Sequence, residues 1–166
     1  MIYFFYGDEE FNISSEIKKL KSKLDKNFLE MSYKEYDNPK YPDLISAIST
    51  LPMMFGKMLI VINCFAYLKS GKKSAKSEDY DELDVLEEDN SSNALDDKQI
   101  KQITDALDNC NENLDIVFVA VNSSDGKKKV DKRKKLFKVL SKYNSKEFEQ
   151  IPSYKTAELE AWIKQQ

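Results

Sequence analysis

Histidine is absent from this sequence of 166 residues. Its absence removes the commonest general base and the usual zinc ligand, and with them every Ser-His or Cys-His catalytic pairing. Cysteine is scarce as well: Cys64 and Cys110 each end an apolar pattern, and neither has a CxxC neighbour. Such cysteines are expected to be a pair of buried free thiols in a reducing compartment. The composition therefore argues against most hydrolase mechanisms.

Long hydrophobic runs are also missing. The longest, Ile2–Tyr6 and Met58–Cys64, are far too short to span a bilayer. The N-terminus has no basic segment followed by an apolar one, so we expect no export signal, a cytoplasmic location and no membrane partner. The formal net charge of -3 argues against general nucleic-acid binding, although it leaves room for a local basic patch.

The negative charge is concentrated in one segment. From Glu78 to Asp97 the chain has ten acidic residues and no basic ones. Such a segment buries too little apolar surface to offset the entropy lost on ordering. We expect a mobile acidic insertion over residues 70–97, within a single domain that covers residues 1–166.

Strand-like patterns alternate with helical ones along the rest of the chain. Strands are expected at Ile2–Tyr6, Met31–Tyr36, Met58–Cys64 and Leu114–Val121, and around Phe148 and Ile151. Apolar residues at helical spacing predict five helices. The inner faces of the first three are Ile13, Ile17, Leu20 and Leu24; Leu44, Ile45, Ile48 and Leu51; and Ile100, Ile103, Leu107 and Cys110. The fourth helix, Lys132–Tyr143, has Asp131 as its N-cap and Leu136, Phe137, Leu140 and Tyr143 inward, and the fifth follows Thr156 with Leu159, Trp162 and Ile163 inward. This alternation predicts one doubly wound α/β domain around a parallel sheet.

The first turn of such a fold is the usual place for a phosphate loop. Here it reads Gly7-Asp8-Glu9-Glu10-Phe11-Asn12, with neither GxxxxGK[ST] nor GxGxxG. Its three carboxylates would repel a triphosphate, so we expect neither a bound nucleotide nor another cofactor. The alternative function is a Mg²⁺-dependent phosphoacceptor, similar to receiver domains, that uses Asp8 and Glu9. That function also needs an aspartate where this chain has Asn63, and a lysine for which Lys155 is the loose candidate.

Two other stretches are candidates for recognition. Leu51-Pro52-Met53-Met54-Phe55-Gly56-Lys57 places three large apolar side chains in a connection that would normally be polar. Met53, Met54 and Phe55 either pack in the core of the domain or contact a partner, and the flexible thioether of methionine suits an irregular pocket. The second stretch is a basic run that either contacts DNA phosphates or forms a solvated helix start, made of Lys127, Lys128, Lys129, Lys132 and Arg133.

Taken in order, four stretches give the chain a resemblance to the N-terminal domain of the bacterial DNA polymerase III delta subunit family. They are Tyr3–Phe11, Leu51–Ile62, Asp131–Lys138 and Glu158–Ile163. The resemblance implies an AAA+/RecA-like fold with a parallel five-stranded sheet in the order 5-1-4-3-2, flanked by helices, and a degenerate phosphate loop. It implies a clamp-loader subunit that acts in DNA replication within a DNA-directed DNA polymerase and has no catalysis of its own.

The resemblance also implies partners and a site. The partners are the ring-shaped sliding clamp (the beta subunit) and the other clamp-loader subunits, with DNA reached indirectly. In the family, an adjacent pair of large apolar residues after a Leu-Pro inserts into a clamp pocket and helps to open the ring. That pair maps onto Met53 and Met54 or, with a shift of one residue, onto Met54 and Phe55. The acidic insertion departs from the family pattern, and the lid and collar domains of the family are expected to be absent.

Overall fold

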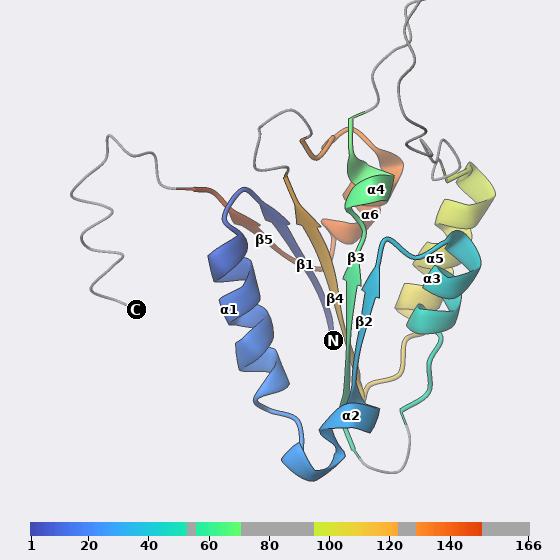
Figure 1. Ribbon diagram of the computed structural model, residues 1–166. Helices are drawn as coiled ribbons and strands as arrows, with labels where there is room; N and C mark the ends of the chain where they lie inside the picture. Colours follow the sequence, from blue (N-terminus) through green and yellow to red (C-terminus); the bar gives the residue numbers. More distant parts are fainter. Residues whose placement is uncertain (53–55, 71–94, 123–128, 151–166) are drawn as a thin grey trace, which may run out of the picture.

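The computed structural model describes residues 1–52, 56–70, 95–122 and 129–150. Within these ranges five parallel strands form one sheet in the order β2-β3-β4-β1-β5 (Figure 1). The strands are β1 (Ile2–Gly7), β2 (Tyr33–Asp37), β3 (Met58–Asn63), β4 (Leu114–Val121) and β5 (Asn144–Phe148). The predicted order 5-1-4-3-2 is this order read from the opposite edge, so the predicted fold class is confirmed.

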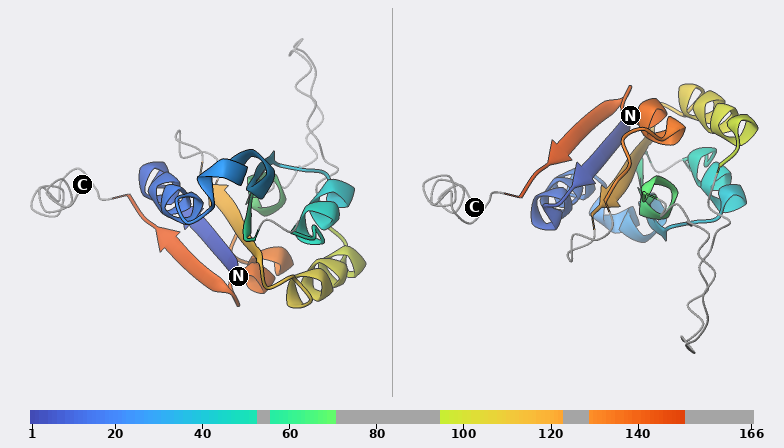
Figure 2. Two further views of the ribbon diagram at one scale, coloured as in Figure 1. Left: turned by 90° about the horizontal axis from the view of Figure 1, so that it is seen from below. Right: turned by 90° about the horizontal axis from the view of Figure 1, so that it is seen from above.

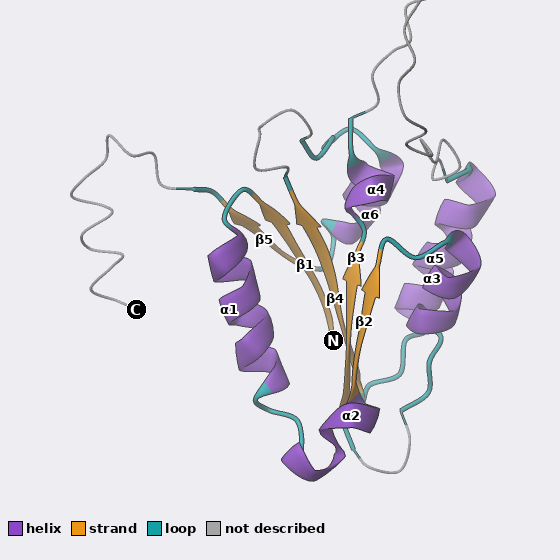
Figure 3. Cartoon of the chain, in the orientation of Figure 1, coloured by secondary structure: helices purple, strands orange, loops and turns teal. Residues whose placement is uncertain are grey.

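Helices cover both faces of the sheet (Figure 3). One face packs against α3 (Tyr41–Ile48), α4 (Phe65–Leu68), α5 (Asp97–Asp108) and α6 (Lys135–Leu140). The other face packs against α1 (Glu10–Lys21) and, after the 3-10 turn η1 (Lys26–Phe28), against α2 (Leu29–Ser32). Among the described residues, none of the helices has the length and apolar content needed to cross a membrane.

The central strands have side chains in both cores. In β3, Ile60 and Ile62 pack on the α3 and α5 face, while Leu59 packs on the α1 face. Strand β4 does the same, with Phe118 on the first face and Val117 on the second. A strand buried on both faces needs apolar residues at every position, which is why these runs show no polar alternation. Strand β5, at one edge of the sheet, is by contrast exposed along most of its length.

Three predicted elements have wrong boundaries. Met31 belongs to α2 and is 60% exposed, so β2 begins two residues later than predicted. Helix α3 ends at Ile48, and Leu51 lies beyond it with 76% of its surface exposed instead of on the buried face. Asp131 is not the N-cap of α6; its carboxylate accepts hydrogen bonds from the backbone N–H and the guanidinium of Arg133, in a turn that precedes the helix. Helix α6 begins at Lys135, three residues later than predicted, and ends at Leu140 instead of Tyr143.

The two cysteines differ in burial. Cys64, directly after β3, is fully buried, and this burial raises the pKa of its thiol to about 12. Cys110, after α5, is half-buried. Both are free thiols, so the predicted buried state is correct for Cys64 and wrong for Cys110. Most of the acidic insertion, at 71–94, and the predicted elements at Ile151 and after Thr156 lie outside the described residues.

Gly7 ends β1 in a conformation that only glycine adopts easily. Its φ angle is +136°, and a Cβ atom at this position would lie 2.1 Å from the carbonyl oxygen of Phe148 in β5. Gly56 also has a positive φ, +99°, but a Cβ atom there would meet nothing within 4 Å. A side chain at Gly56 would therefore meet backbone strain alone, whereas a side chain at Gly7 would meet the same strain and a steric clash.

Replacing Gly7 with alanine should destabilise the fold much more than replacing Gly56. Gly56→Ala should lower the free energy of unfolding by about 1–2 kcal/mol, the usual cost of a left-handed conformation. Gly7→Ala adds the clash and the loss of hydrogen bonds to Phe148, and should cost at least about 2 kcal/mol more. Urea unfolding of both variants measures the difference. Equal losses would contradict the close approach of β5 to this turn.

Candidate functional site

The turn after β1 occupies the place of a phosphate loop, and three of its backbone amides already have partners. The N–H groups of Asp8 and Glu9 both donate to the carbonyl oxygen of Phe148, at 2.9 and 3.1 Å. Two residues further on, the amide of Phe11 donates to the carboxylate of Glu9 at 3.3 Å. A helix N-terminus binds phosphate through amides such as these. Here a phosphate would have to displace the end of β5 and the N-cap of α1.

The carboxylate of Asp8 has a structural role at the same edge. It accepts a hydrogen bond from the side-chain amide of Asn122, which directly follows β4. Asn122 also donates its backbone N–H to the carbonyl of Gly7 at 2.9 Å, and its side-chain oxygen accepts from Val130 N–H at 2.8 Å. Asp8 and Asn122 therefore tie together the ends of β1 and β4. The sequence offered no signal for this pairing, because the two residues are far apart in the chain.

The sheet order is wrong for the phosphoacceptor alternative. A receiver-like fold has the strand order 2-1-3-4-5, which sets its third strand beside its first. Here β4 lies between β1 and β3, so Asn63 and Asp8 end strands that are not neighbours. Asn63 instead donates to Asp37 at 2.7 Å and accepts from Phe65 N–H at 3.1 Å. Within the described ranges no cluster of three or more acidic or cysteine side chains could hold a metal ion, and Lys155 lies outside those ranges.

Most of the described basic run is paired within the chain. The Lys132 ammonium lies 2.6 Å from the Glu147 carboxylate of β5, and Arg133 lies 3.0 Å from Asp131. This pairing lowers the pKa of Asp131 to about 2, chiefly through the side-chain hydrogen bond from Arg133. Lys129 is exposed, and Lys127 and Lys128 lie outside the described residues. A DNA phosphate would therefore compete with carboxylates for Lys132 and Arg133.

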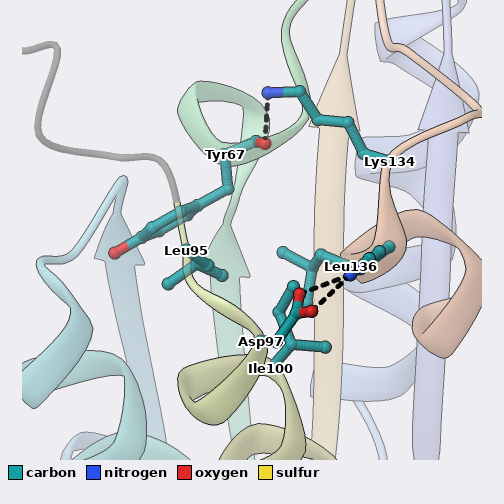
Figure 4. Close-up of a pocket in the computed structure, with 7 residues that line it drawn as sticks. Tyr67, Leu95, Asp97, Ile100, Lys134 and Leu136 are labelled. Atoms are coloured by element: carbon teal, nitrogen blue, oxygen red, sulfur yellow. Dashed lines mark hydrogen bonds and ion pairs between the residues drawn. The ribbon is translucent and has the colours of Figure 1, made fainter.

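A pocket of about 270 Å³ lies beside this run, between α4, α5 and α6 (Figure 4). Lys134 donates from its ammonium to the carbonyl of Tyr67 at 2.8 Å, and Lys135 pairs with Asp97 at 2.5 Å. Burial lowers the pKa of Lys134, as does the nearby charge of Lys69, against an opposing effect of Asp131. Because both amines have partners in the protein, these contacts hold three helices together and leave no cation aimed into the pocket.

The chain that leads into the other candidate site and out of it, residues 51–52 and 56–57, lies before β3, at the opposite, amino end of the sheet. Met53, Met54 and Phe55 themselves lie outside the described residues. Leu51 before them and Gly56 after them are exposed. Two residues further on, Met58 is buried, and its backbone N–H donates to the carbonyl of Asn113 at 2.9 Å. The loop thus departs from the end of a central strand that is fixed in the core.

Adding ATP with Mg²⁺ should leave the melting temperature unchanged, because the amides of the first turn are occupied. A nucleotide present at 100 times its Kd would add about 2.7 kcal/mol to the stability. For a chain of this size, each kcal/mol raises the melting temperature by roughly 2–4 °C. Thermal melts with millimolar MgATP, and with MgSO₄ alone as the control, test this. A rise of several degrees with MgATP would contradict it, and a rise with MgSO₄ alone would restore the Mg²⁺ alternative.

Comparisons with known proteins find a family match and a solved structure with a similar fold. A family model described as "DNA polymerase III, delta subunit" matches residues 3–88, which is more than half of the chain. A search of curated proteins found no match. Among solved structures, the DNA clamp loader delta protein of Bacillus subtilis superposes with a TM-score of 0.66 at 18% sequence identity, over 95% of this chain and 41% of that one. The fold is therefore the fold of that protein, of which this chain spans less than half the length. The chain belongs to the DNA polymerase III delta subunit family.

Proposed function

We propose that this domain binds the sliding clamp, the beta subunit, through the loop Met53–Phe55 and helps to open the ring during DNA replication. The observation that supports this best is the position of the loop. It lies within the residues matched by the delta family, 3–88, and combines three large apolar residues with a half-buried Pro52 before them and an exposed Gly56 after them. An apolar loop on an exposed end of a rigid sheet is suited to a pocket on another protein.

The rigid base under the loop has a mechanical use. The loop is joined directly to β3, which pairs on one side with β2 and on the other with β4. Residues from Met58 to Ile62 are all buried in that strand. An apolar anchor attached to such a strand would transmit force to the whole domain while the strand stays folded. This is what a subunit that strains a closed ring needs.

The affinity would come from few side chains. Apolar anchors that fill a partner's pocket typically cost about 2–4 kcal/mol each when truncated. The register stays open between Met53 with Met54 and Met54 with Phe55. The flexible methionines would adapt to the shape of the pocket, and Phe55 would supply the larger apolar area.

We also propose that the domain works without binding ATP and without catalysis of its own. The amides of Asp8 and Glu9 that would hold a phosphate donate to Phe148 instead. ATP hydrolysis would then belong to other subunits of the clamp loader, which are the further partners proposed here. A DNA contact through Lys127, Lys128, Lys129, Lys132 and Arg133 stays a prediction.

Calorimetric titration of the domain into the cognate clamp tests the proposal. The wild type should bind with micromolar or tighter affinity, and Met53→Ala with Met54→Ala should weaken binding by about 100-fold or more. The matched control, Met53→Leu with Met54→Leu, keeps the apolar volume and should stay within about threefold of the wild type. A second double variant, Met54→Ala with Phe55→Ala, decides the register. The pair that enters the clamp pocket should show the larger loss of affinity.

Thermal melts of every variant separate docking from folding. If the three residues dock on a partner, the alanine variants should melt at the temperature of the wild type. A lowered melting temperature would place them in the core of the domain. A clamp titration with no heat for the wild type would contradict the proposed function.

A further inference from the structure

Lysines gather at the C-terminal end of α1 and in the turn that follows it. Residues 18–26 contain five lysines and one acidic residue. Helix α1 runs from the carboxyl end of the sheet to its amino end (Figure 1), so these lysines lie at the amino end, which the left view of Figure 2 shows from below. The proposed function gives them no role. They are here called the α1 lysine cluster, and all but the third are exposed: Lys18, Lys19, Lys21, Lys23 and Lys26.

Most of the exposed charge in the cluster is unpaired. Lys19 shares the carboxylate of Glu16 with Lys146, at distances of 3.2 and 3.5 Å. The acidic residue inside the cluster, Asp25, caps η1, where its carboxylate accepts a hydrogen bond from a backbone N–H of that turn at 2.9 Å. The exposed lysines that have no carboxylate partner in the described part of the chain are Lys18, Lys23 and Lys26.

The basic run ahead of α6 differs in this respect, because two of its described charges are paired within the chain. Lys132 lies 2.6 Å from Glu147. Arg133 lies 3.0 Å from Asp131. A polyanion would have to displace these carboxylates from the basic run, whereas the α1 lysine cluster offers three ammonium groups without such a competitor. The two surfaces lie at opposite ends of the sheet, so they can be tested separately.

Helix stability explains only part of the cluster. Cations in the last turn of a helix interact favourably with its dipole, which accounts for the lysines of that turn. Lys23 and Lys26 follow the end of the helix, and Lys23 stands four residues after Lys19, a spacing at which like charges repel. The backbone there is fixed, since Leu24 is 8% exposed and packs in the core on the α1 face. The cluster therefore holds like charges together on a rigid base, which an anionic partner would stabilise.

The composition of the cluster favours a nucleic-acid backbone over other anionic partners. Residues 18–26 contain none of the aromatic, methionine or arginine side chains in which protein–protein interfaces are enriched, and lysine is depleted there. The two leucines of the segment, Leu20 and Leu24, pack inward, whereas a helix that lies on a membrane buries its apolar side chains in the lipid. Without aromatic side chains the segment has no platform for stacking single-stranded bases. Lysines alone suit the phosphates of a duplex.

We propose that the α1 lysine cluster binds the phosphate backbone of duplex DNA without reading its sequence. Each ammonium group binds a phosphate as a point charge, and the release of counterions from the DNA supplies the affinity. Phosphate contacts carry no information about the bases, so the binding is expected to be independent of sequence. This inference does not depend on the clamp contact, because none of its residues belongs to the loop Met53–Phe55 or to the chain on either side of it.

Fluorescence anisotropy with a labelled duplex of about 20 bp, at about 50 to 200 mM NaCl, tests the proposal. Each phosphate contact adds about 0.9 to the slope of log K against log [NaCl], so about three to four contacts should lower the affinity of the wild type by about 40- to 150-fold across this range. Lys18→Gln with Lys23→Gln and Lys26→Gln should weaken binding at the lowest salt by at least about tenfold and reduce the slope by about 2.7. Arginine at the same three positions keeps the charge and should keep the slope.

The matched control removes three positive charges from the other face of the sheet. Lys98 and Lys101 in α5 and Lys138 in α6 are exposed lysines on helices that pack against that face. Replacing all three with glutamine changes the net charge as the α1 variant does. It should leave the affinity for the duplex within about twofold of the wild type, with the same salt slope. Thermal melts of every variant check the fold.

Several results would overturn the proposal. One is a wild type that does not bind the duplex at the lowest salt, and another is an α1 variant that binds it as the wild type does. If Lys132→Gln with Arg133→Gln abolishes binding while the α1 variant retains it, the basic run is the DNA contact instead. Vesicles of phosphatidylglycerol are the probe for a lipid surface, and binding to them without binding to the duplex would assign the cluster to a membrane. The clamp titration contains no DNA, so neither result there depends on this one.

Discussion

The carbonyl oxygen of Phe148, at the end of β5, is the acceptor on which the carboxyl edge of this sheet depends. It receives the backbone N–H groups of both Asp8 and Glu9, and this is possible because Gly7 has no side chain. The same contact joins the last described strand to the first helix. It also takes the two amides that a phosphate loop would offer to a nucleotide. One interaction thus explains a structural glycine, the attachment of β5 and the lack of a free anion site at this turn.

The two ends of the sheet consequently differ in chemistry. At the carboxyl end, hydrogen bonds among Gly7, Asp8, Asn122 and Phe148 close the surface where α/β folds usually bind small ligands. At the amino end, Met31 in α2 and Leu51 in the segment between α3 and β3 are exposed. Closed polar networks suit a scaffold, whereas exposed apolar side chains suit contact with another protein. This contrast favours recognition over catalysis more strongly than any single residue does.

The sequence was most informative where burial leaves no alternative. Strands β3 and β4 are buried on both faces, so their unbroken apolar runs predicted them well. Prediction failed where tertiary contacts outweigh local pattern: Met31 looks like the start of a strand, yet the segment forms α2, in which Ser32 is buried and Leu29 is partly buried against the core. Asp131 has the character of an N-cap but pairs with Arg133. The key acceptor, a backbone carbonyl of Phe148, has no signature in any sequence, and the clamp contact proposed for Met53–Phe55 depends on the surface of another protein.

Hydrogen–deuterium exchange of the domain, alone and with the cognate clamp, tests most directly whether the amino end of the sheet is the working surface. The account predicts slower exchange on clamp binding in peptides that cover residues 51–58, which lead into β3. Peptides that cover the first turn, residues 7–11, and the basic segment, residues 129–135, should exchange at the same rate with and without the clamp. Protection of the first turn or of the basic segment, with no change ahead of β3, would contradict the account and move the interface to the opposite end of the sheet.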